Sequence, residues 1–200
     1  MSFSGSALGI ATDESCANTC QGTLLASQDG GVSWTPVLRA AGPVFATVNS
    51  TGQVWAAYPY PAGSPTHVRF VASADVGRVW KALGEWTSLA PLSTQVRITL
   101  AAGAQDRLAW AAVVDDGGCS MHGCAVASLL GSADQGLTWT DATLPRLPAG
   151  PLYDQCGGGW LSAMAAAPDG GVWAATLQNS GACSPPFGEV YRDGPSGWTS

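Results

Sequence analysis

The sequence predicts an all-β protein assembled from about four repeats of a four-stranded antiparallel unit. Three observations lead to this prediction. A turn motif recurs along the chain, a tryptophan-containing apolar segment recurs upstream of it, and no stretch shows a capped 3.6-residue period. Glycine and proline account for 26 and 13 of the 200 residues, so the chain is expected to turn often.

The recurring turn motif reads S-x-D-x-G-x-x-W at residues 27–34, 73–80 and 132–139. We call these segments the three aspartate turns. At 191–198 only Asp193 and Trp198 keep the same spacing, so this segment is a weaker fourth copy. The intervals between successive motif aspartates are 46, 59 and 59 residues, a period typical of architectures built from stacked supersecondary units.

The upstream segment reads V-W-A-A at 54–57 and 172–175, and A-W-A-A at 109–112. Because Trp55, Trp110 and Trp173 repeat with the turns, we expect them in the core. In the first unit, the same residue count back from Asp29 leads to Gly9, so that unit keeps the register but lacks the tryptophan.

Each unit reads as four short strands. In the second unit these are 44–49, 53–60, 67–73 and 78–83, and the third of them alternates apolar and polar positions. Small four-stranded sheets at this period are typical of β-propeller blades. We therefore predict a single domain over residues 1–200, with blades at approximately 1–39, 40–86, 87–145 and 146–200.

The first and last blades are expected to be incomplete, because their outer segments match only part of a strand. This favours an arc of a six- or seven-bladed ring, while a small closed ring and a half-ring that closes by dimerising are alternatives. Unclosed sheet edges expose unpaired backbone groups. Self-association through such edges is therefore an expected mode of interaction.

The aspartate turns resemble Asp-boxes, the BNR repeats of sialidases and related β-propellers. The resemblance covers nearly the whole chain, and three of the four motifs are intact. It implies a blade hairpin on the face opposite the ligand site. Propellers with this repeat include sialidases, xyloglucan-degrading hydrolases, sortilin-type receptor domains and photosystem assembly factors, so the motif is specific for the fold and unspecific for function.

The motif residues have local structural roles. An aspartate in a tight turn accepts backbone N–H bonds, a serine adds a second local bond, a glycine permits positive φ, and a tryptophan buries a large ring between sheets. The residues assigned to these structural roles are Ser27, Asp29, Gly31, Trp34, Ser73, Asp75, Gly77, Trp80, Ser132, Asp134, Gly136, Trp139, Asp193 and Trp198.

Ligand-binding residues are expected in the loops at the other end of the strands, which we call the loop face. Carboxylates beside aromatic rings suit carbohydrate recognition, because sugar faces stack on rings and hydroxyls donate to carboxylates. The same loops also hold Asp13, Glu14 and His122. The ligand-binding candidates are Tyr58, Tyr60, Trp86, Asp115, Asp116, Arg146, Tyr153 and Asp154.

Six cysteines fall in these same loops, in pairs that are local or come from neighbouring loops. An even count suggests disulfides and an oxidising compartment. The favoured disulfide pairs are Cys16 with Cys20, Cys119 with Cys124, and Cys156 with Cys183. A metal site at Cys119, His122 and Cys124 is an alternative with unusual spacing, so no metal or cofactor is expected.

Composition excludes several classes of partner. Charged residues make up 11% of the chain and the formal net charge is −6, which argues against nucleic acid and anionic membrane surfaces. No apolar run approaches the roughly 20 residues of a membrane helix. The first residues lack a signal-peptide pattern, yet the cysteines favour an extracellular, periplasmic or cell-surface location.

No complete catalytic set is found. The Arg-Ile-Pro motif of sialidases is absent, because Arg97 is followed by Ile98 and Thr99 and is expected inside a strand. We therefore predict a non-catalytic binding module, extracellular or in the cell envelope, that recognises a glycan or protein through its disulfide-bearing loop face. The alternatives are a fragment of a sialidase-like or xyloglucanase-like glycoside hydrolase with an incomplete active site, and an assembly or scaffold factor.

Overall fold

The fold is known from a computed structural model of the chain. It describes residues 2–4, 8–16, 20–49, 51–61, 65–88, 91–93, 96–103, 109–115, 126–142, 160–167, 172–178, 187–194 and 197–199. Within these ranges every regular element is a β-strand, in agreement with the predicted all-β class. Over the same ranges, no helix is long and apolar enough to cross a membrane.

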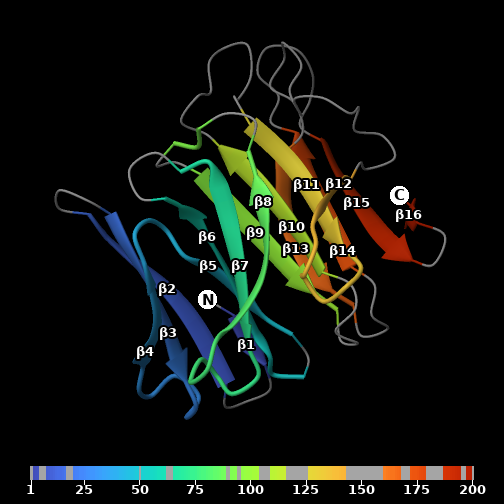
Figure 1. The fold of residues 1–200 in the computed structure, drawn as a ribbon. Helices are drawn as coiled ribbons and strands as arrows, with labels where there is room; N and C mark the ends of the chain where they lie inside the picture. The colour runs from blue at the N-terminus through green and yellow to red at the C-terminus, as the bar shows by residue number, and fades with distance from the viewer. Residues whose placement is uncertain are drawn as a thin grey trace.

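The strands form four antiparallel sheets, each made of four strands consecutive in the chain (Figure 1). The first sheet contains β1 (Ser2–Ser4), β2 (Leu8–Cys16), β3 (Cys20–Ser27) and β4 (Thr35–Ala40). The second contains β5 (Phe45–Val48), β6 (Val54–Tyr60), β7 (His67–Ser73) and β8 (Lys81–Thr87).

The third sheet contains β9 (Val96–Ala102), β10 (Ala109–Asp115), β11 (Val126–Ser132) and β12 (Thr140–Ala142). The fourth contains β13 (Trp160–Ala166), β14 (Val172–Gln178), β15 (Phe187–Gly194) and β16 (Gly197–Thr199). The predicted tetrads of short strands are therefore confirmed.

The first strand of each sheet lies nearest to the neighbouring sheets. Strand β5 contacts β1 and β2 on one side and β9 on the other, and β9 also contacts β13. Figure 1 shows the sheets following one another from the blue to the red end of the chain. This is the arrangement of propeller blades around an axis, with the first strand of each blade innermost.

Apolar layers fill the three spaces between successive sheets. The layer between the first and second sheets includes Ile10 and Leu24, which are 2% and 0% exposed. The layer between the second and third sheets includes Phe70 and Leu130. A smaller layer around Tyr191 joins the third and fourth sheets. Each sheet therefore buries a face only because another sheet packs against it.

Strand pairing aligns the sheets residue by residue. The motif serine lies opposite Val54 in the second sheet and opposite Gly9 in the first. The residue that matches Trp55 and Trp110 in the first sheet is therefore Ile10, and the expectation that Gly9 takes this place is wrong. Residue counting missed the shift because the β2–β3 connection is shorter than the β6–β7 connection.

The fourth sheet also departs from the expected alignment. Val172 lies opposite Asp193, so Asp193 takes the position of the motif serine and not that of the motif aspartate. Strand β15 continues to Gly194, which pairs with Gly197. A longer β14–β15 connection and a shorter β15–β16 turn offset each other in the residue count, so the fourth segment is not a fourth aspartate turn.

The repeated tryptophans are buried unequally. Trp55 is 3% exposed, Trp110 is half-buried, and Trp173 is 44% exposed. The prediction that Trp173 lies in the core is therefore wrong. Trp55 and Trp110 face the next sheet, and Trp173 lies on the face of the fourth sheet that points away from the third.

Candidate functional site

The three aspartate turns share one hydrogen-bond network at one end of the strands. In the first turn, the Ser27 hydroxyl donates to Asp29 Oδ1 at 2.7 Å and accepts the Gly31 N–H at 2.8 Å. Asp29 Oδ1 also accepts the Ser33 N–H at 2.9 Å. The same pattern recurs in the turns at 73–80 and 132–139. The side chains thus replace the backbone partners that a tight turn cannot supply.

These bonds favour the ionised carboxylates. Hydrogen bonds from the Ser33 hydroxyl and backbone lower the pKa of Asp29 to about 2. The pKa of Asp75 is lowered mainly by the Ser73 hydroxyl, and that of Asp134 mainly by the Thr138 hydroxyl. Each carboxylate is occupied by its own turn, which fits a structural role.

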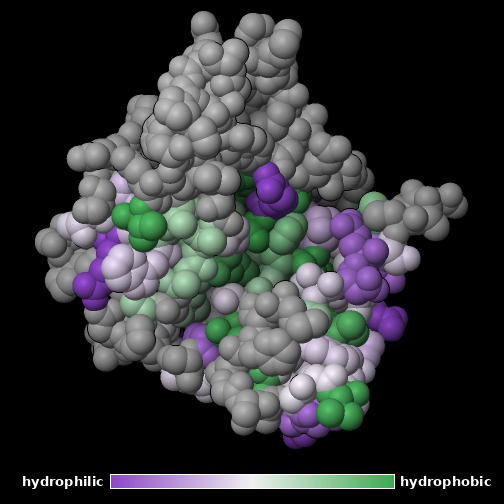
Figure 2. All heavy atoms as spheres, turned by 180° about the vertical axis from the view of Figure 1, so that it is seen from behind, coloured by the Kyte–Doolittle hydropathy of each residue, from purple (hydrophilic) through white to green (hydrophobic). Residues whose placement is uncertain are grey.

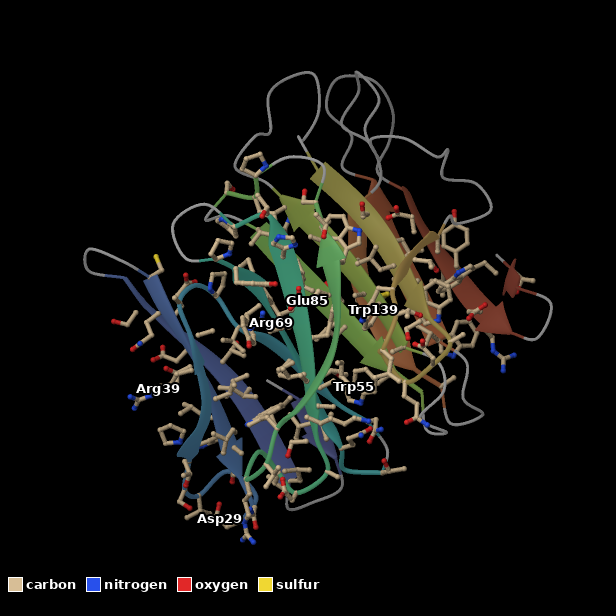
Figure 3. The ribbon with its side chains drawn as sticks, viewed as in Figure 1. Asp29, Arg39, Trp55, Arg69, Glu85 and Trp139 are labelled. Atoms are coloured by element: carbon tan, nitrogen blue, oxygen red, sulfur yellow. The ribbon has the colours of Figure 1, made fainter. Side chains whose placement is uncertain are left out.

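The turn tryptophans join neighbouring sheets. Trp139 stacks on Phe70 of the second sheet, with ring centroids 4.0 Å apart and planes inclined by 22°. Trp80 donates its indole N–H to the Val37 carbonyl oxygen of β4 at 2.8 Å. Figure 3 shows Trp139 and Trp55 between the second and third sheets, and Asp29 at the far end of the first. The turn end of the blades therefore holds the sheets together.

The opposite end of the strands carries a cavity of about 310 Å³. It forms where the end of β2, the β4–β5 connection and the starts of β5 and β9 meet. Three successive sheets thus contribute to it, through β2 of the first sheet and the first strands of the second and third. Its lining residues are Thr12, Asp13, Glu14, Pro43, Val44, Phe45, Val96 and Arg97.

The cavity combines an apolar base with charged groups. Val44 and Val96 are 4% and 3% exposed, whereas Asp13, Glu14 and Arg97 are exposed. On the side turned away in Figure 1, apolar side chains gather in the middle of the molecule with polar ones around them (Figure 2). A small pocket with apolar walls and a few polar groups is a common setting for ligand recognition.

A polar cluster lies on the second sheet, toward the loop-face ends of β6, β7 and β8. Arg69 donates from Nε and Nη2 to Glu85 Oε1 at 3.0 and 2.9 Å, and the Tyr60 hydroxyl donates to Glu85 Oε2. The guanidinium of Arg69 lies 4.0 Å from the Tyr60 ring centre. His67 hydrogen-bonds Thr87 through Nδ1 at 3.0 Å. Figure 3 shows Arg69 and Glu85 pointing toward one another.

The cluster is internally satisfied. The Tyr60 hydroxyl lowers the pKa of Glu85, while Glu85 raises the pKa values of Tyr60 and Arg69. Both carboxylate oxygens of Glu85 therefore already accept hydrogen bonds from within the cluster. Tyr58, another candidate, is half-buried and packs in the layer between the first and second sheets.

Trp86 is not a surface platform for a ligand. It is 8% exposed and packs in the layer between the second and third sheets. The sequence predicted that the fourth strand of this unit ends at Leu83, but β8 runs from Lys81 to Thr87. Trp86 therefore lies within a strand, on a covered face, and the expectation that it lies in a loop is wrong; its predicted ligand-binding role stays a prediction.

The remaining candidates divide by position. Asp115 ends β10, and its backbone lies opposite Val96, a lining residue of the cavity. Asp116, Arg146, Tyr153 and Asp154 lie outside the described residues, so their predicted roles stay predictions.

Sequence reasoning missed Arg97 as a site residue, because its place inside a strand suggested a structural role. That place is correct, since Arg97 belongs to β9, but it is near the loop-face end of an inner strand. The sequence feature that could have indicated a site residue is the position of Arg97, a charged residue directly after the first residue of β9. The partners from β2 and the β4–β5 connection are distant in sequence, and only the packing of the sheets brings them together.

The cysteines are described in part. Cys16 and Cys20 lie opposite each other at the end of the β2–β3 hairpin. Cys20 is disulfide-bonded. Cys119, Cys124, Cys156 and Cys183, together with His122, lie outside the described residues. In the part of the chain that is described, no group of three histidine, cysteine or acidic residues could hold a metal.

No family model and no curated protein matches this chain. Several solved structures are similar to this chain. The GH74 enzyme of Niastella koreensis has a TM-score of 0.51 at 15% identity, over 90% of this chain and 26% of that chain. The NanB sialidase of Streptococcus pneumoniae has a TM-score of 0.51 at 12% identity, over 86% and 26%.

The Hadza microbial sialidase Hz136 is similar as well, with a TM-score of 0.51 at 15% identity over 97% of this chain and 38% of that chain. The chain thus spans between about a quarter and two fifths of the length of these enzymes. At such identities the likeness concerns the fold alone. Taken with the four successive sheets, it shows that this chain has the β-propeller fold found in sialidase-like glycosidases.

Proposed function

We propose that the chain is a non-catalytic binding module, extracellular or in the cell envelope, that recognises a glycan through its loop face. The observation that supports this proposal most is the 310 Å³ cavity at the loop-face ends of three successive sheets. Its size lies at the lower end of the range of about 300–1,000 Å³ that is usual for small-ligand sites.

The chemistry of the cavity suits a sugar. Phe45 and Val44 offer apolar surface to the carbon face of a ring, and Glu14, which shares a face of β2 with Ile10, offers acceptors to hydroxyl groups. Arg97 supplies donors in a planar arrangement that also fits an acidic sugar or a carboxylate. A protein ligand would need a wider contact area than a cavity of this size provides, so we favour the glycan.

The absence of catalysis in this proposal rests on strand geometry. Hydrolysis of a glycosidic bond usually needs two carboxyl groups on either side of that bond. Asp13 and Glu14 are adjacent in β2, and adjacent side chains of a strand point to opposite faces of the sheet. The two carboxylates therefore diverge and do not flank a common bond.

The location outside the cytoplasm and the relation to Asp-box propellers are parts of the same proposal. The hydrogen bonds of the three aspartate turns support the relation, because the serine, aspartate and glycine of the motif are all used. The disulfide-bonded Cys20 supports an oxidising compartment. Cys16 is its proposed partner, because it lies directly opposite in the strand register.

The test is binding to an array of oligosaccharides, followed by calorimetric titration of each hit. We expect saturable binding that is lost in Arg97→Met and in the double variant Asp13→Asn, Glu14→Gln. The control is Arg39→Met, which removes an exposed arginine from β4, away from the cavity lining. Binding that is unaffected by the cavity variants, or lost equally in Arg39→Met, contradicts the proposed site.

A glycoside hydrolase is the second candidate, because the similar solved structures are named as a GH74 enzyme and sialidases. Release of reducing sugar from any array hit, abolished by Asp13→Asn or Glu14→Gln, would favour it over the binding module. If neither glycan binding nor hydrolysis is found, an assembly or scaffold role through a protein partner becomes the better proposal.

A further inference from the structure

The fourth sheet has one covered face and one exposed face. The exposed face, which we call the C-terminal face, consists of Ala163, Ala165, Trp173, Ala175, Val190 and Arg192. Its largest apolar side chains are Trp173 and Val190, which are 44% and 57% exposed. At the left of Figure 2, green and pale side chains of this part of the molecule lie at the surface beside purple ones.

The matching positions of the other sheets are covered. Strand register matches Trp173 to Trp55, which is 3% exposed. It matches Val190 to Phe70 and Leu129, which are 0% and 8% exposed. In both cases a tryptophan of the next sheet packs in the same cluster, Trp139 of the third turn with Phe70 and Trp198 of β16 with Leu129. The C-terminal face therefore has the residue pattern of an interface between sheets.

The first sheet has the complementary exposed surface. Leu25 is half-buried, although the matching residues Val71, Leu130 and Tyr191 are 6%, 0% and 0% exposed. Val32, at the tip of the first aspartate turn, is 86% exposed. We call Leu25, Val32 and Trp34 the N-terminal face.

The two interfaces inside the chain show how an aspartate turn docks. At the first, Trp80 of the second turn donates to the Val37 carbonyl oxygen of β4 at 2.8 Å. At the second, the Gly84 N–H of β8 donates to the Gly136 carbonyl oxygen of the third turn at 2.6 Å. In both interfaces an aspartate turn thus docks on the sheet that precedes it in the chain. The first aspartate turn has the same serine, aspartate, glycine and tryptophan as these two turns.

We propose that the C-terminal face of one chain receives the first aspartate turn of a second copy, in a head-to-tail contact that repeats the contacts between sheets within the chain. The charges agree with this occupant, because the Arg192 guanidinium lies over the Trp173 ring of the C-terminal face, 5.4 Å from its centre, and Asp29 lies in the turn. A heterologous contact made twice closes a ring of two copies with eight sheets, which is within the range of known propellers.

The test is the molar mass of the chain by light scattering and sedimentation over a dilution series. We expect a species of about twice 20.3 kDa that dissociates on dilution. Val32→Asp and Trp173→Asp should each give the single-chain mass. Each substitution buries an unpaired charge in both of the contacts that close the two-chain ring. Both residues are exposed, so folding is preserved, and circular dichroism checks this. Val79→Asp, at a residue 68% exposed on the second turn, is the matched control and should keep the doubled mass.

Mixing the two variants distinguishes head-to-tail contact from other association. A Val32→Asp chain keeps an intact C-terminal face, and a Trp173→Asp chain keeps an intact first turn, so an equimolar mixture should recover a 1:1 complex. A wild-type chain with the single-chain mass at every concentration overturns the proposal. So does a doubled mass that persists in either variant, or a mixture that remains at the single-chain mass.

Discussion

The two ends of the blades differ in whether their residues and hydrogen bonds repeat from sheet to sheet. At the turn end, three segments far apart in sequence have the same serine, aspartate and glycine hydrogen bonds, and two of them dock on the preceding sheet. At the loop end, the described residues show no such repeat. The cavity there takes Asp13 and Glu14 from the first sheet, Phe45 from the second and Arg97 from the third. Residues that repeat between sheets therefore stabilise the fold, whereas the cavity residues, which do not repeat, are the candidates for binding a ligand.

The largest difference is expected from a glycine at the turn end. In Gly136→Ala the new Cβ would lie 2.7 Å from Trp55 and 2.9 Å from Leu83, at a φ of 78°. Backbone strain and overpacking together should lower the free energy of unfolding by about 3 kcal/mol or more, as measured by urea unfolding. Gly52→Ala is the control, because it has a φ of 83° and its nearest neighbour, Leu8, is 3.7 Å away. It should cost about 1–2 kcal/mol, and equal costs would refute the docking of the third turn.

Removal of a buried hydroxyl at the turn end should have the next largest effect. In Ser73→Ala, the Gly77 N–H loses its acceptor and Asp75 loses a donor. Ser73 is 2% exposed, so the expected loss of unfolding free energy is about 1–3 kcal/mol. Thr140→Ala removes an exposed hydroxyl that donates to Gly131, and should change stability by less than about 0.5 kcal/mol. Similar losses in the two variants would show that the turn network is not stabilising.

Acid should weaken the turn end. The pKa of Asp29 is about 2 when folded and 3.8 without these contacts, so its stabilising contribution is complete above about pH 4 and is lost as the pH falls toward 2. Asp29→Asn should make the unfolding free energy depend less on pH in this window. Carboxyl NMR titration measures the pKa directly, and an Asp29 value near 4 would contradict the turn hydrogen bonds.

The smallest effect is expected near the loop end. Arg69 and Glu85 form an exposed ion pair, with side chains 38% and 40% exposed. Glu85→Gln should therefore lower the unfolding free energy by less than about 1 kcal/mol. It should also leave glycan affinity unchanged, because Glu85 does not line the cavity. A loss of affinity in Glu85→Gln would extend the binding site from the cavity onto the second sheet.

The fold could be predicted because strand tetrads and turns are encoded locally. Alternation in β7 and the turn motif at 73–80 were sufficient for the second sheet. Errors arose where residue counting replaced strand register. Asp193 and Gly9 were matched to the wrong positions, because connections of different length shift the pairing without changing the spacing between motifs.

The site could be predicted only in part, since it depends on how the sheets pack. Trp86 was expected in a loop, but β8 is longer than its apolar pattern indicated, and the third sheet covers it. Arg97 was set aside because it lies in a strand. Its value as a site residue arises from the neighbouring ends of β2 and β5, which no local pattern could indicate.

The most direct test of the contrast between the two ends is differential scanning calorimetry of Ser73→Ala and Arg97→Met, each with and without an oligosaccharide that binds the wild-type chain. We predict that Ser73→Ala lowers the Tm and keeps the upward shift caused by the sugar. Arg97→Met should lower the Tm less than Ser73→Ala does and should lose that shift. A sugar-induced shift that persists in Arg97→Met, or is lost in Ser73→Ala while that protein is still folded, would contradict the assignment of binding to the loop end.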